Sequence, residues 1–592
     1  MMNAHVEKRE SFKFSGNWRL NFLYFCFVIL AIAAAARLFY IAVYQHDFYL
    51  AIATGSHELY SKLFPERGEV FIRDSRTNEN YPLAMNRDYY ALYFDTTKIK
   101  DDETASTTVA KLAEIFNYDT ARQAVVFSQL NKRTDLYEIV EKKLEDNVMK
   151  KIEAMNLPGA NFSRRSYRFY PENVMASAVS GFVGKDDNDV DVGRYGVEGY
   201  WNKEMSGSGG LMVGARSAKG SLIPLQDWSF ERAADGADVY LTIDRTLQYK
   251  ACERLRAGMV EFGAVSAALI MIEPDTGVIR AMCSLPDYNP NEYGKVENSE
   301  AFNNSAIFRA YEPGSIMKPI VMAAGVNEGV VSPTSPFHDS GERVGLCDTP
   351  IQNADDKKYG DVNMTGVLEN SINTGMVFVA EKLGAEKFRE YFSKYGFGVK
   401  TGIPLDSEVG GTVESLGKKS KSGKITCEMA TASFGQGVMA TPLQMVMAYG
   451  AIANGGKLMK PMIVDEVVYA DGHREKTKPQ EVRRVMDERT ARLVSGMLGS
   501  VIENGHSAGG RIRGYYIGGK TGTAQIAGSG GYSEENTNHS FVGIAPVDDP
   551  KFVIIVKFEK PKAMWAESTA TPVFHDVAEF ALRYYQIPPT RK

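Results

Sequence analysis

The sequence predicts an α+β protein in three parts: a single N-terminal transmembrane helix, an elongated α+β region, and a C-terminal domain with an antiparallel sheet flanked by helices. Three observations predict this organisation. An apolar run lies near the N-terminus, short extended and helical segments alternate after it, and extended runs enclose a mostly helical stretch at the C-terminal end. At 592 residues the chain is too long for one compact core, so several domains are expected.

The apolar run covers residues 21–44, NFLYFCFVILAIAAAARLFYIAVY, and contains one charge, Arg37. A helix of about 20 apolar residues crosses a bilayer. The tail before it, residues 1–20, is basic, with Lys8, Arg9, Lys13 and Arg19. The positive-inside rule therefore predicts a cytoplasmic N-terminus and an extracytoplasmic remainder. A cleavable signal peptide is the alternative, although the length of the run favours a retained anchor.

The second part, residues 45–235, mixes short extended runs with helical segments. Extended runs are expected at 68–74 and 89–95, and helices at 119–129 and 144–155. None of these segments carries a recognisable catalytic motif. This part is therefore predicted to be a non-catalytic α+β domain.

The third part, residues 236–592, begins with a strand that ends at Asp244 and a helix over 246–259. A strand pair follows over 267–282, with a turn at the PDTG of residues 274–277. Helical segments occupy the middle, and extended runs return at 540–546 and 552–558 before a final helix over 573–585. Strands at both ends with helices between them predict one antiparallel sheet covered by helices.

The composition excludes several classes of function. The formal net charge of -5 gives no basic surface for nucleic acid. The eight histidines show no H-E-x-x-H or similar spacing, so neither a metal site nor a cofactor is predicted. The five cysteines are scattered and contain no C-x-x-C pair, which argues against both a zinc site and a disulfide scaffold.

The segment GYYIGGKTGTAQ, residues 514–525, fits two different patterns. It matches the P-loop G-x-x-x-x-G-K-[ST], and its Lys520-Thr521-Gly522 matches the K-T-G element of serine acyltransferases. A P-loop requires a helix directly after the lysine, whose N-terminus binds phosphate. Here the following residues, TGTAQIAGSGGY, are too rich in glycine to sustain a helix. The acyltransferase interpretation is therefore favoured.

Two further acyltransferase elements lie upstream in the required order. Ser315-Ile316-Met317-Lys318 has the pattern S-x-x-K and follows Pro313-Gly314, which indicates a helix start. A spacing of three places Ser315 and Lys318 on one helix face, within hydrogen-bond reach. A serine hydroxyl needs an adjacent base to become a nucleophile, and Lys318 can be that base if burial and a neighbouring cation lower its pKa.

The second element is Ser371-Ile372-Asn373, with the pattern S-x-N. Ser371 is expected to relay a proton between Lys318 and the leaving amine, and Asn373 to hold the substrate amide. On the K-T-G strand, Lys520 would supply positive charge and Thr521 a hydroxyl for the substrate carboxylate. The backbone N–H groups of Ser315 and Thr523 are the expected oxyanion hole. Each motif alone is common in structural contexts, and their joint occurrence in order is what favours catalysis.

With these motifs, the chain resembles a class B penicillin-binding protein over nearly its whole length. Further resembling segments are Arg67-Gly68 with Arg73-Asp74, Arg168-Phe169-Tyr170-Pro171, Gly193-x-x-Gly196-Val197-Glu198, and SFGQGVMATPLQ at residues 433–444. The Glu312-Pro313-Gly314-Ser315 form is similar to the division-specific branch. The resemblance implies a cytoplasmic tail (1–20), a transmembrane helix (21–44), a non-catalytic pedestal of the dimerisation type (45–235) and a transpeptidase domain (236–592).

The resemblance also implies a reaction and partners. Ser315 would attack the penultimate D-alanine of a peptidoglycan stem peptide and pass the acyl group to an amine on a neighbouring stem, without a cofactor. Lys318, Ser371, Asn373 and Lys520 would be catalytic, and Thr521, Gly522 and Thr523 would bind substrate. β-Lactams would acylate Ser315. The implied partners are a polytopic, SEDS-type glycan polymerase and other division proteins of the inner membrane.

Two alternatives stay open on the sequence. A D,D-carboxypeptidase or β-lactamase would use water as the acceptor with the same motifs. A non-catalytic scaffold or β-lactam sensor of the division machinery would retain the fold with a vestigial pocket. The intact Ser315, Lys318, Asn373 and Lys520 argue against the second alternative. The residues leave open whether any of the four cysteines beyond the apolar run form pairs.

Overall fold

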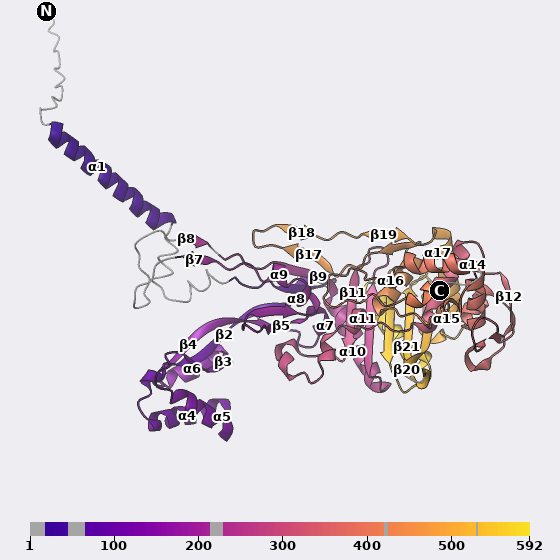
Figure 1. The fold of residues 1–592 in the computed structure, drawn as a ribbon, viewed down its shortest axis with the longest axis horizontal. Helices are drawn as coiled ribbons and strands as arrows, with labels where there is room; N and C mark the ends of the chain where they lie inside the picture. Colours follow the sequence, from indigo (N-terminus) through magenta and orange to yellow (C-terminus); the bar gives the residue numbers. More distant parts are fainter. Residues whose placement is uncertain are drawn as a thin grey trace, which may run out of the picture. The chain divides into compact units, whose positions relative to one another are not determined.

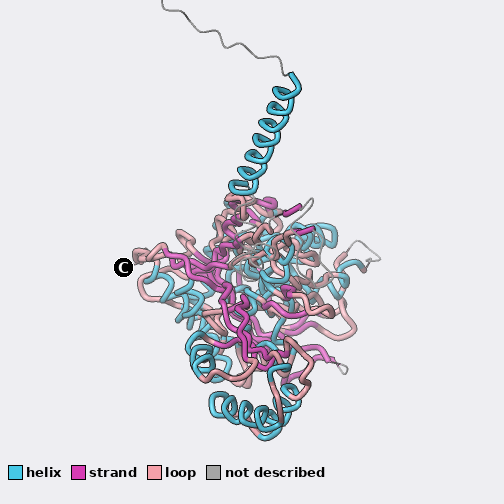
Figure 2. Tube along the Cα trace, turned by 90° about the vertical axis from the view of Figure 1, so that its left-hand side faces the viewer, coloured by secondary structure: helices cyan, strands magenta, loops and turns pink. Residues whose placement is uncertain are grey.

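The computed structural model describes residues 18–44, 65–213, 229–231, 233–418, 424–528 and 531–591. Helices and strands both occur throughout the chain beyond the first helix (Figures 1 and 2), which confirms the predicted α+β class. The chain forms two compact units. One contains residues 1–65 and 208–233, and the other contains residues 66–207 and 234–592.

In the smaller unit, helix α1 (Trp18–Phe39) continues into a π-helical turn, Tyr40–Tyr44. A short hairpin pairs β7 (Leu211–Val213) with β8 (Ser229–Glu231). The stretch Asn21–Phe39 is apolar, exposed and long enough to span a membrane. The predicted apolar helix is thus present and fits a single-pass anchor. The basic residues Lys8, Arg9 and Lys13 lie outside the described residues.

A seven-stranded sheet dominates the first part of the larger unit, in the order β18-β17-β9-β1-β2-β3, with β4 also paired to β2. Strands β1 and β9 are parallel, and the other pairs are antiparallel. The sheet joins strands from both sides of the boundary predicted at residue 235. The strands are β1 (Val70–Asp74), β2 (Glu79–Phe94), β3 (Glu138–Leu144), β4 (Ala160–Phe169), β9 (Asp238–Asp244), β17 (Val464–Val468) and β18 (Arg474–Lys476).

Three helices cover the far end of the β2–β4 ribbon (Figure 1). They are α4 (Asp102–Phe116), α5 (Thr120–Leu130) and α6 (Asp146–Ala154). Aspartate caps begin two of them, since the Asp101 side chain accepts from Thr104 N and the Asp119 side chain from Arg122 N. Apolar residues of these helices form a separate small core with Leu92 and Phe94 of β2. The helices predicted at 119–129 and 144–155 are therefore confirmed.

A buried ionic cluster joins three of the segments that resemble the family's pedestal. Glu198 is fully buried on α8 (Gly196–Tyr200) and accepts from Arg67 Nη2 at 2.6 Å and from Arg168 Nε at 2.6 Å. The Tyr170 hydroxyl also donates to Glu198, at 3.3 Å. Burial alone would raise the pKa of Glu198, but the two guanidinium charges outweigh it and lower that pKa. Nearby short elements are α7 (Ser177–Ser180), β5 (Phe182–Lys185), β6 (Asp191–Arg194) and α9 (Asn202–Met205).

A five-stranded sheet forms the centre of the C-terminal part, in the order β11-β10-β22-β21-β20. Every pair is antiparallel, as the sequence predicts. Its strands are β10 (Ser266–Ile272), β11 (Ile279–Leu285), β20 (Gly518–Gly528), β21 (Gly531–Ala545) and β22 (Phe552–Glu559). Strand β20 lies at one edge of this sheet.

Both faces of this sheet are buried, because side chains alternate between them along each strand. Ala268, Ile270 and Ile272 of β10 belong to the core formed with α12, α14 and α16. Leu269 and Met271 belong to the core formed with α10 and α18 on the opposite face. The helices are α10 (Arg245–Glu261), α11 (Ser305–Phe308), α12 (Lys318–Asn327), α13 (Met364–Glu369), α14 (Asn373–Lys394), α15 (Cys427–Ala432), α16 (Pro442–Ala453), α17 (Glu488–Asn504) and α18 (Ala570–Tyr584).

Small strand pairs complete the larger unit, each antiparallel. They are β12 (Pro336–Asp339) with β15 (Gly360–Asn363), β13 (Glu342–Arg343) with β14 (Ile351–Gln352), and β16 (Lys457–Met459) with β19 (Glu481–Arg484). The first two pairs lie between Ser315 and Ser371 in the sequence. They therefore belong to the segment that connects two of the predicted catalytic motifs.

The scattered cysteines argue against a disulfide scaffold and leave open whether any of them pair, and the structure shows that four of them form two disulfides. Cys252 on α10 is bonded to Cys283 on β11, and Cys347 is bonded to Cys427 at the start of α15. The partners are 31 and 80 residues apart, so their contacts depend on the tertiary fold and leave no local spacing pattern. Cys26 on α1 is free.

Candidate active site

Ser315 lies in a 3₁₀ turn, Gly314–Met317, that leads directly into α12. Gly314 has φ = +58°, in the left-handed region that favours glycine. A side chain there would also be crowded, because a Cβ at Gly314 would lie 3.0 Å from the Ala524 Cβ of β20. The turn therefore holds the serine against the edge strand.

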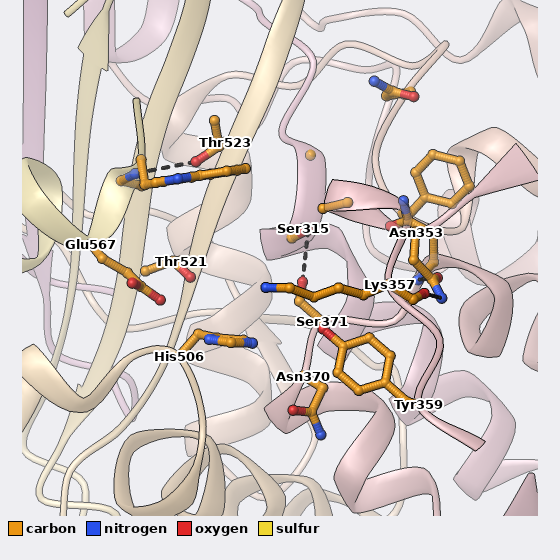
Figure 3. A pocket seen from close by; sticks show the side chains of 17 residues that line it. Ser315, Asn353, Lys357, Tyr359, Asn370, Ser371, His506, Thr521, Thr523 and Glu567 are labelled. Carbon is orange, nitrogen blue, oxygen red and sulfur yellow. Dashed lines mark hydrogen bonds between the residues drawn. The ribbon is translucent and has the colours of Figure 1, made fainter. Parts of the chain in front are cut away.

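Lys318 begins α12 and is fully buried. Its Nζ donates to the Ser371 carbonyl oxygen at 2.5 Å, to Ser371 Oγ at 3.1 Å and to Asn373 Oδ1 at 2.7 Å. Ser371 Oγ in turn donates to Ser315 Oγ at 3.0 Å (Figure 3). The sequence predicts direct contact between Lys318 and Ser315. The structure instead connects them through Ser371, because three acceptors at the start of α14 converge on the amine.

Two buried lysines set the electrostatics of the site. Burial and the nearby positive charge of Lys520 hold the pKa of Lys318 well below its usual value. Lys520 is 1% exposed, and its burial lowers its own pKa to about 8, with Glu567 acting in the opposite direction. The lowered pKa makes it easier for Lys318 to lose a proton and become an amine base, and it lies beside a second lysine whose pKa of about 8 leaves it mostly charged at neutral pH.

The K-T-G residues lie on β20, an edge strand of the five-stranded sheet, so the predicted strand is confirmed. Side-chain alternation places Lys520 on one face of the strand and Thr521 and Thr523 on the other. Gly522 is required by close packing, since a Cβ there would lie 2.8 Å from Ser540 Oγ and 2.9 Å from the Pro313 carbonyl oxygen. The chain continues as a strand after Lys520. A phosphate-binding helix N-terminus is therefore absent from residues 521–528, and the P-loop interpretation is excluded.

A cavity of about 310 Å³ joins the three motifs. Five predicted residues line it: Ser315, Ser371, Asn373, Thr521 and Thr523. The other three predicted residues, Lys318, Lys520 and Gly522, are buried. All eight thus occupy one region of the fold, although they come from three distant parts of the sequence.

Several lining residues were not predicted as site residues. Figure 3 shows the Lys357 side chain extending across the pocket towards the side formed by Glu567 and His506, with Asn353 and Tyr359 near its base. Asn353, Lys357, Tyr359 and His506 lie between the motifs in the sequence, whereas Glu567 lies after the third motif in a 3₁₀ turn, Ala566–Ser568, and no local pattern marks any of them. Phe434 and Gln436 also line the pocket. They belong to the SFGQG segment, so only the family resemblance offered a signal for them.

This arrangement has the parts needed for covalent acyl transfer. The Ser315 hydroxyl is connected through the Ser371 hydroxyl to a buried lysine amine of lowered pKa, the kind of pairing that can activate a serine as a nucleophile. The backbone N–H of Ser315 lies at the start of a helical segment, opposite an edge strand with two pocket-lining threonines. A cation is buried behind those threonines. An acyl substrate with a free carboxylate matches this combination of groups.

Comparison with known protein families identifies both parts of the larger unit. Residues 267–579 match the family described as "Penicillin binding protein transpeptidase domain". Residues 62–241 match the family described as "Penicillin-binding Protein dimerisation domain". All the predicted site residues lie within the first match.

Similar curated proteins span nearly the whole chain. "Stage V sporulation protein D" of Bacillus subtilis is 30% identical, covering 97% of this chain and 86% of that protein. The "Peptidoglycan D,D-transpeptidase FtsI homolog" of Mesostigma viride is 28% identical, and the match covers 99% of this chain and 98% of that protein. The "Probable peptidoglycan D,D-transpeptidase PbpC" of Pseudomonas aeruginosa is 28% identical, and the match covers 97% of this chain and 96% of that protein.

Solved structures show the same fold. Penicillin Binding Protein 2X from Streptococcus thermophilus gives a TM-score of 0.72 at 21% identity, covering 88% of this chain and 80% of that one. Penicillin binding protein 3 from Mycobacterium tuberculosis, in complex with aztreonam, gives a TM-score of 0.67 at 23% identity. The match covers 89% of this chain and 99% of that one. The matching domains, the relatives and the fold together show that this chain belongs to the class B penicillin-binding proteins.

Proposed function

We propose that the protein is a serine D,D-transpeptidase that cross-links peptidoglycan stem peptides through an acyl-enzyme on Ser315. The hydrogen-bonded series Lys318–Ser371–Ser315, opposite the Thr521 and Thr523 side of β20, carries this proposal. The names of the Mesostigma viride and Pseudomonas aeruginosa relatives, which both contain "peptidoglycan D,D-transpeptidase", support it.

In the acylation step, Ser315 Oγ attacks the carbonyl carbon of the penultimate D-alanine. Its proton passes to Ser371 Oγ while the Ser371 proton passes to the neutral amine of Lys318. The backbone N–H groups of Ser315 and Thr523 stabilise the oxyanion. The amine of the terminal D-alanine then takes a proton back along the same route, the peptide bond breaks, and D-alanine leaves.

The second step transfers the acyl group to an amine of a neighbouring stem. Lys318, again neutral, accepts the proton of that amine through Ser371, and Ser315 recovers its own proton when its ester bond breaks. Asn373 holds the substrate amide, and Lys520, Thr521, Gly522 and Thr523 form the carboxylate-binding side of the site. β-Lactams acylate Ser315 because their ring amide enters in place of the D-alanyl peptide bond.

The proposal also covers the membrane and the domain boundaries. Residues 1–20 are assigned to the cytoplasm, 21–44 to the membrane, 45–235 to the pedestal and 236–592 to the extracytoplasmic transpeptidase domain. The apolar α1 supports the anchor. The two disulfides support the orientation, because disulfides persist outside the reducing cytoplasm.

We further propose a role in septal wall synthesis during cell division. The FtsI homolog among the relatives supports this role. No glycosyltransferase motif occurs in the sequence. Glycan polymerisation is therefore assigned to a polytopic, SEDS-type partner that binds the anchor and pedestal together with other division proteins of the inner membrane.

The test uses the purified full-length protein in detergent, incubated with a fluorescent penicillin beside Ser315→Ala. A stable covalent band that disappears only in the variant supports the acyl-enzyme. Donor pentapeptide and an acceptor amine are then supplied together. Cross-linked product identifies a transpeptidase, whereas release of D-alanine with hydrolysed donor alone identifies a carboxypeptidase.

Two outcomes contradict the proposal. Rapid turnover of the penicillin with only a transient band indicates a β-lactamase. No band with folded, unmodified protein indicates a non-catalytic scaffold with a vestigial pocket, or an active site that opens only with its membrane partner.

A further inference from the structure

Helix α14 carries Asn373 at its first position, yet its own preceding residue cannot cap it. That residue is Ile372, which has no side-chain hydrogen-bond acceptor. The first N–H groups of a helix have no partners within the helix and need acceptors from elsewhere. The start of α14 therefore depends on another segment of the chain.

Asn353 provides that acceptor from 20 residues upstream. Its Oδ1 accepts from Asn373 N at 3.0 Å and from Thr374 N at 3.2 Å. The preceding residue contributes as well, since the Gln352 carbonyl oxygen accepts from Asn373 Nδ2 at 2.9 Å. The last residue of β14 and the residue after it thus hold the side chain and the backbone of Asn373.

Asp339 in turn fixes the Asn353 side chain. The Asp339 carboxylate is 2% exposed and accepts from Asn353 Nδ2 at 2.9 Å and from Thr374 Oγ1 at 2.6 Å. It also accepts from the backbone N–H groups of Tyr359 and Gly341. With four donors, this carboxylate is fully satisfied although it is buried. The Asn353 amide is therefore locked in the orientation that points Oδ1 at the helix.

The consequence reaches the catalytic groups. Asn373 Oδ1 and both oxygens of Ser371 receive the three hydrogen bonds of the Lys318 amine. Ser371 has φ = +54°, a backbone conformation that a serine keeps only when its surroundings impose it. Backbone hydrogen bonds from Ser371 N to Leu368 O and from Ile372 N to Val367 O hold this position from one side, and Asn353 holds the residues that follow it.

We propose that Asn353, oriented by Asp339, is a positioning residue that caps α14 from a separate segment and thereby fixes Ser371 and Asn373 around Lys318. The inference rests on the proposed acyl transfer at Ser315. It assigns to Asn353 an effect on the reaction rate beyond its contribution to folding. No contact with the reacting atoms is assigned to Asn353 or Asp339.

The experiment measures the rate constant for acylation by fluorescent penicillin, normalised to folded protein, together with Tm. The matched control is Asp119→Ala, which removes the cap of α5, a helix remote from the pocket. Asn353→Ala is expected to acylate roughly 10- to 100-fold more slowly, because small misplacements of catalytic groups have effects of this size. The control is expected to acylate at the unmodified rate with a similar fall in Tm.

A swap of the two side chains keeps the test decisive if Asn353→Ala does not fold. Asn353→Asp alone faces Asp339 with a second carboxylate and is expected to acylate slowly. Adding Asp339→Asn restores a donor–acceptor pair and is expected to recover part of the rate. Acylation at the unmodified rate in Asn353→Ala, or no recovery in the swap, overturns the inference. If the unmodified protein itself is not labelled, the proposed function fails instead.

Discussion

The pedestal and the active site each bury ionisable side chains, but only the pedestal places opposite charges in direct contact. In the pedestal, the Glu198 carboxylate is paired with two guanidinium groups, those of Arg67 and Arg168. In the active site, Lys318 and Lys520 are buried close enough for one charge to lower the pKa of the other. Within the described residues, neither amine has a carboxylate at ion-pair distance.

The difference separates a structural use of burial from a chemical one. Removing one member of a compensated buried pair leaves an isolated charge, so the pedestal cluster contributes to stability. Burying two amines without a carboxylate at ion-pair distance opposes folding, and a protein retains such an arrangement where it needs a reactive group. The two sites should therefore respond to mutation in different observables, stability in one and reactivity in the other.

The largest expected effect is the loss of acylation in Lys318→Met. Methionine has a similar length but no proton acceptor, so acylation by penicillin should fall by roughly 10²- to 10⁴-fold, the usual contribution of a general base. Tm should be equal to that of the unmodified protein or higher, because a buried amine has been removed. Rate constants from gel fluorescence and Tm from calorimetry test this. A large fall in Tm with normal acylation of the folded fraction would show that Lys318 contributes to stability and is not needed for reactivity, contrary to this prediction.

The converse change is Glu198→Gln in the pedestal. Leaving two buried arginines without their carboxylate should lower the free energy of unfolding by about 3–5 kcal/mol. Acylation per folded molecule should stay the same. Denaturant unfolding provides the measurement. Glu145→Gln is a suitable control because it removes a half-exposed partner of Arg87 and should change stability by at most about 1 kcal/mol.

The pH dependence of the acylation rate should reflect the titration of both Lys318 and Lys520. Lys318 acts when it is neutral, so the rate should rise as pH increases through its lowered pKa. Lys520 acts when it is charged, so the rate should fall as pH increases through about 8. The product is a bell-shaped profile. Stopped-flow acylation across this range tests it, and a rate that keeps rising above the pKa of Lys520 would remove Lys520 from the mechanism.

The smallest expected effect concerns Glu567. Its negative charge opposes the lowering of the Lys520 pKa, so Glu567→Gln should shift the alkaline side of the profile to lower pH. Glu579→Gln on α18 makes the same change of charge outside the residues that line the pocket. It should leave the profile in place. An equal shift in both variants would show that only net charge matters.

The sequence predicts which residues come together at the pocket because each motif is local. Ser315 and Lys318 are three residues apart, as are Lys520 and Thr523, and helix or strand geometry alone relates them. Asn353, Asp339 and Glu567 could not be predicted in this way. Their contacts join segments that are distant in sequence, and an isolated asparagine or aspartate in a loop resembles any turn residue. The two disulfides escaped prediction for the same reason.

The edge position of β20 has a consequence for what the site recognises. In the described sheet β20 pairs with β21 alone, so no further strand covers its other edge beside the serine. An extended peptide that lies there is held as an added strand, by its main chain. Recognition of this kind depends on backbone direction and chirality more than on side-chain identity. A drug that imitates the ligand's backbone would form hydrogen bonds with the main chain of β20. Mutations that change only side chains leave these main-chain groups in place.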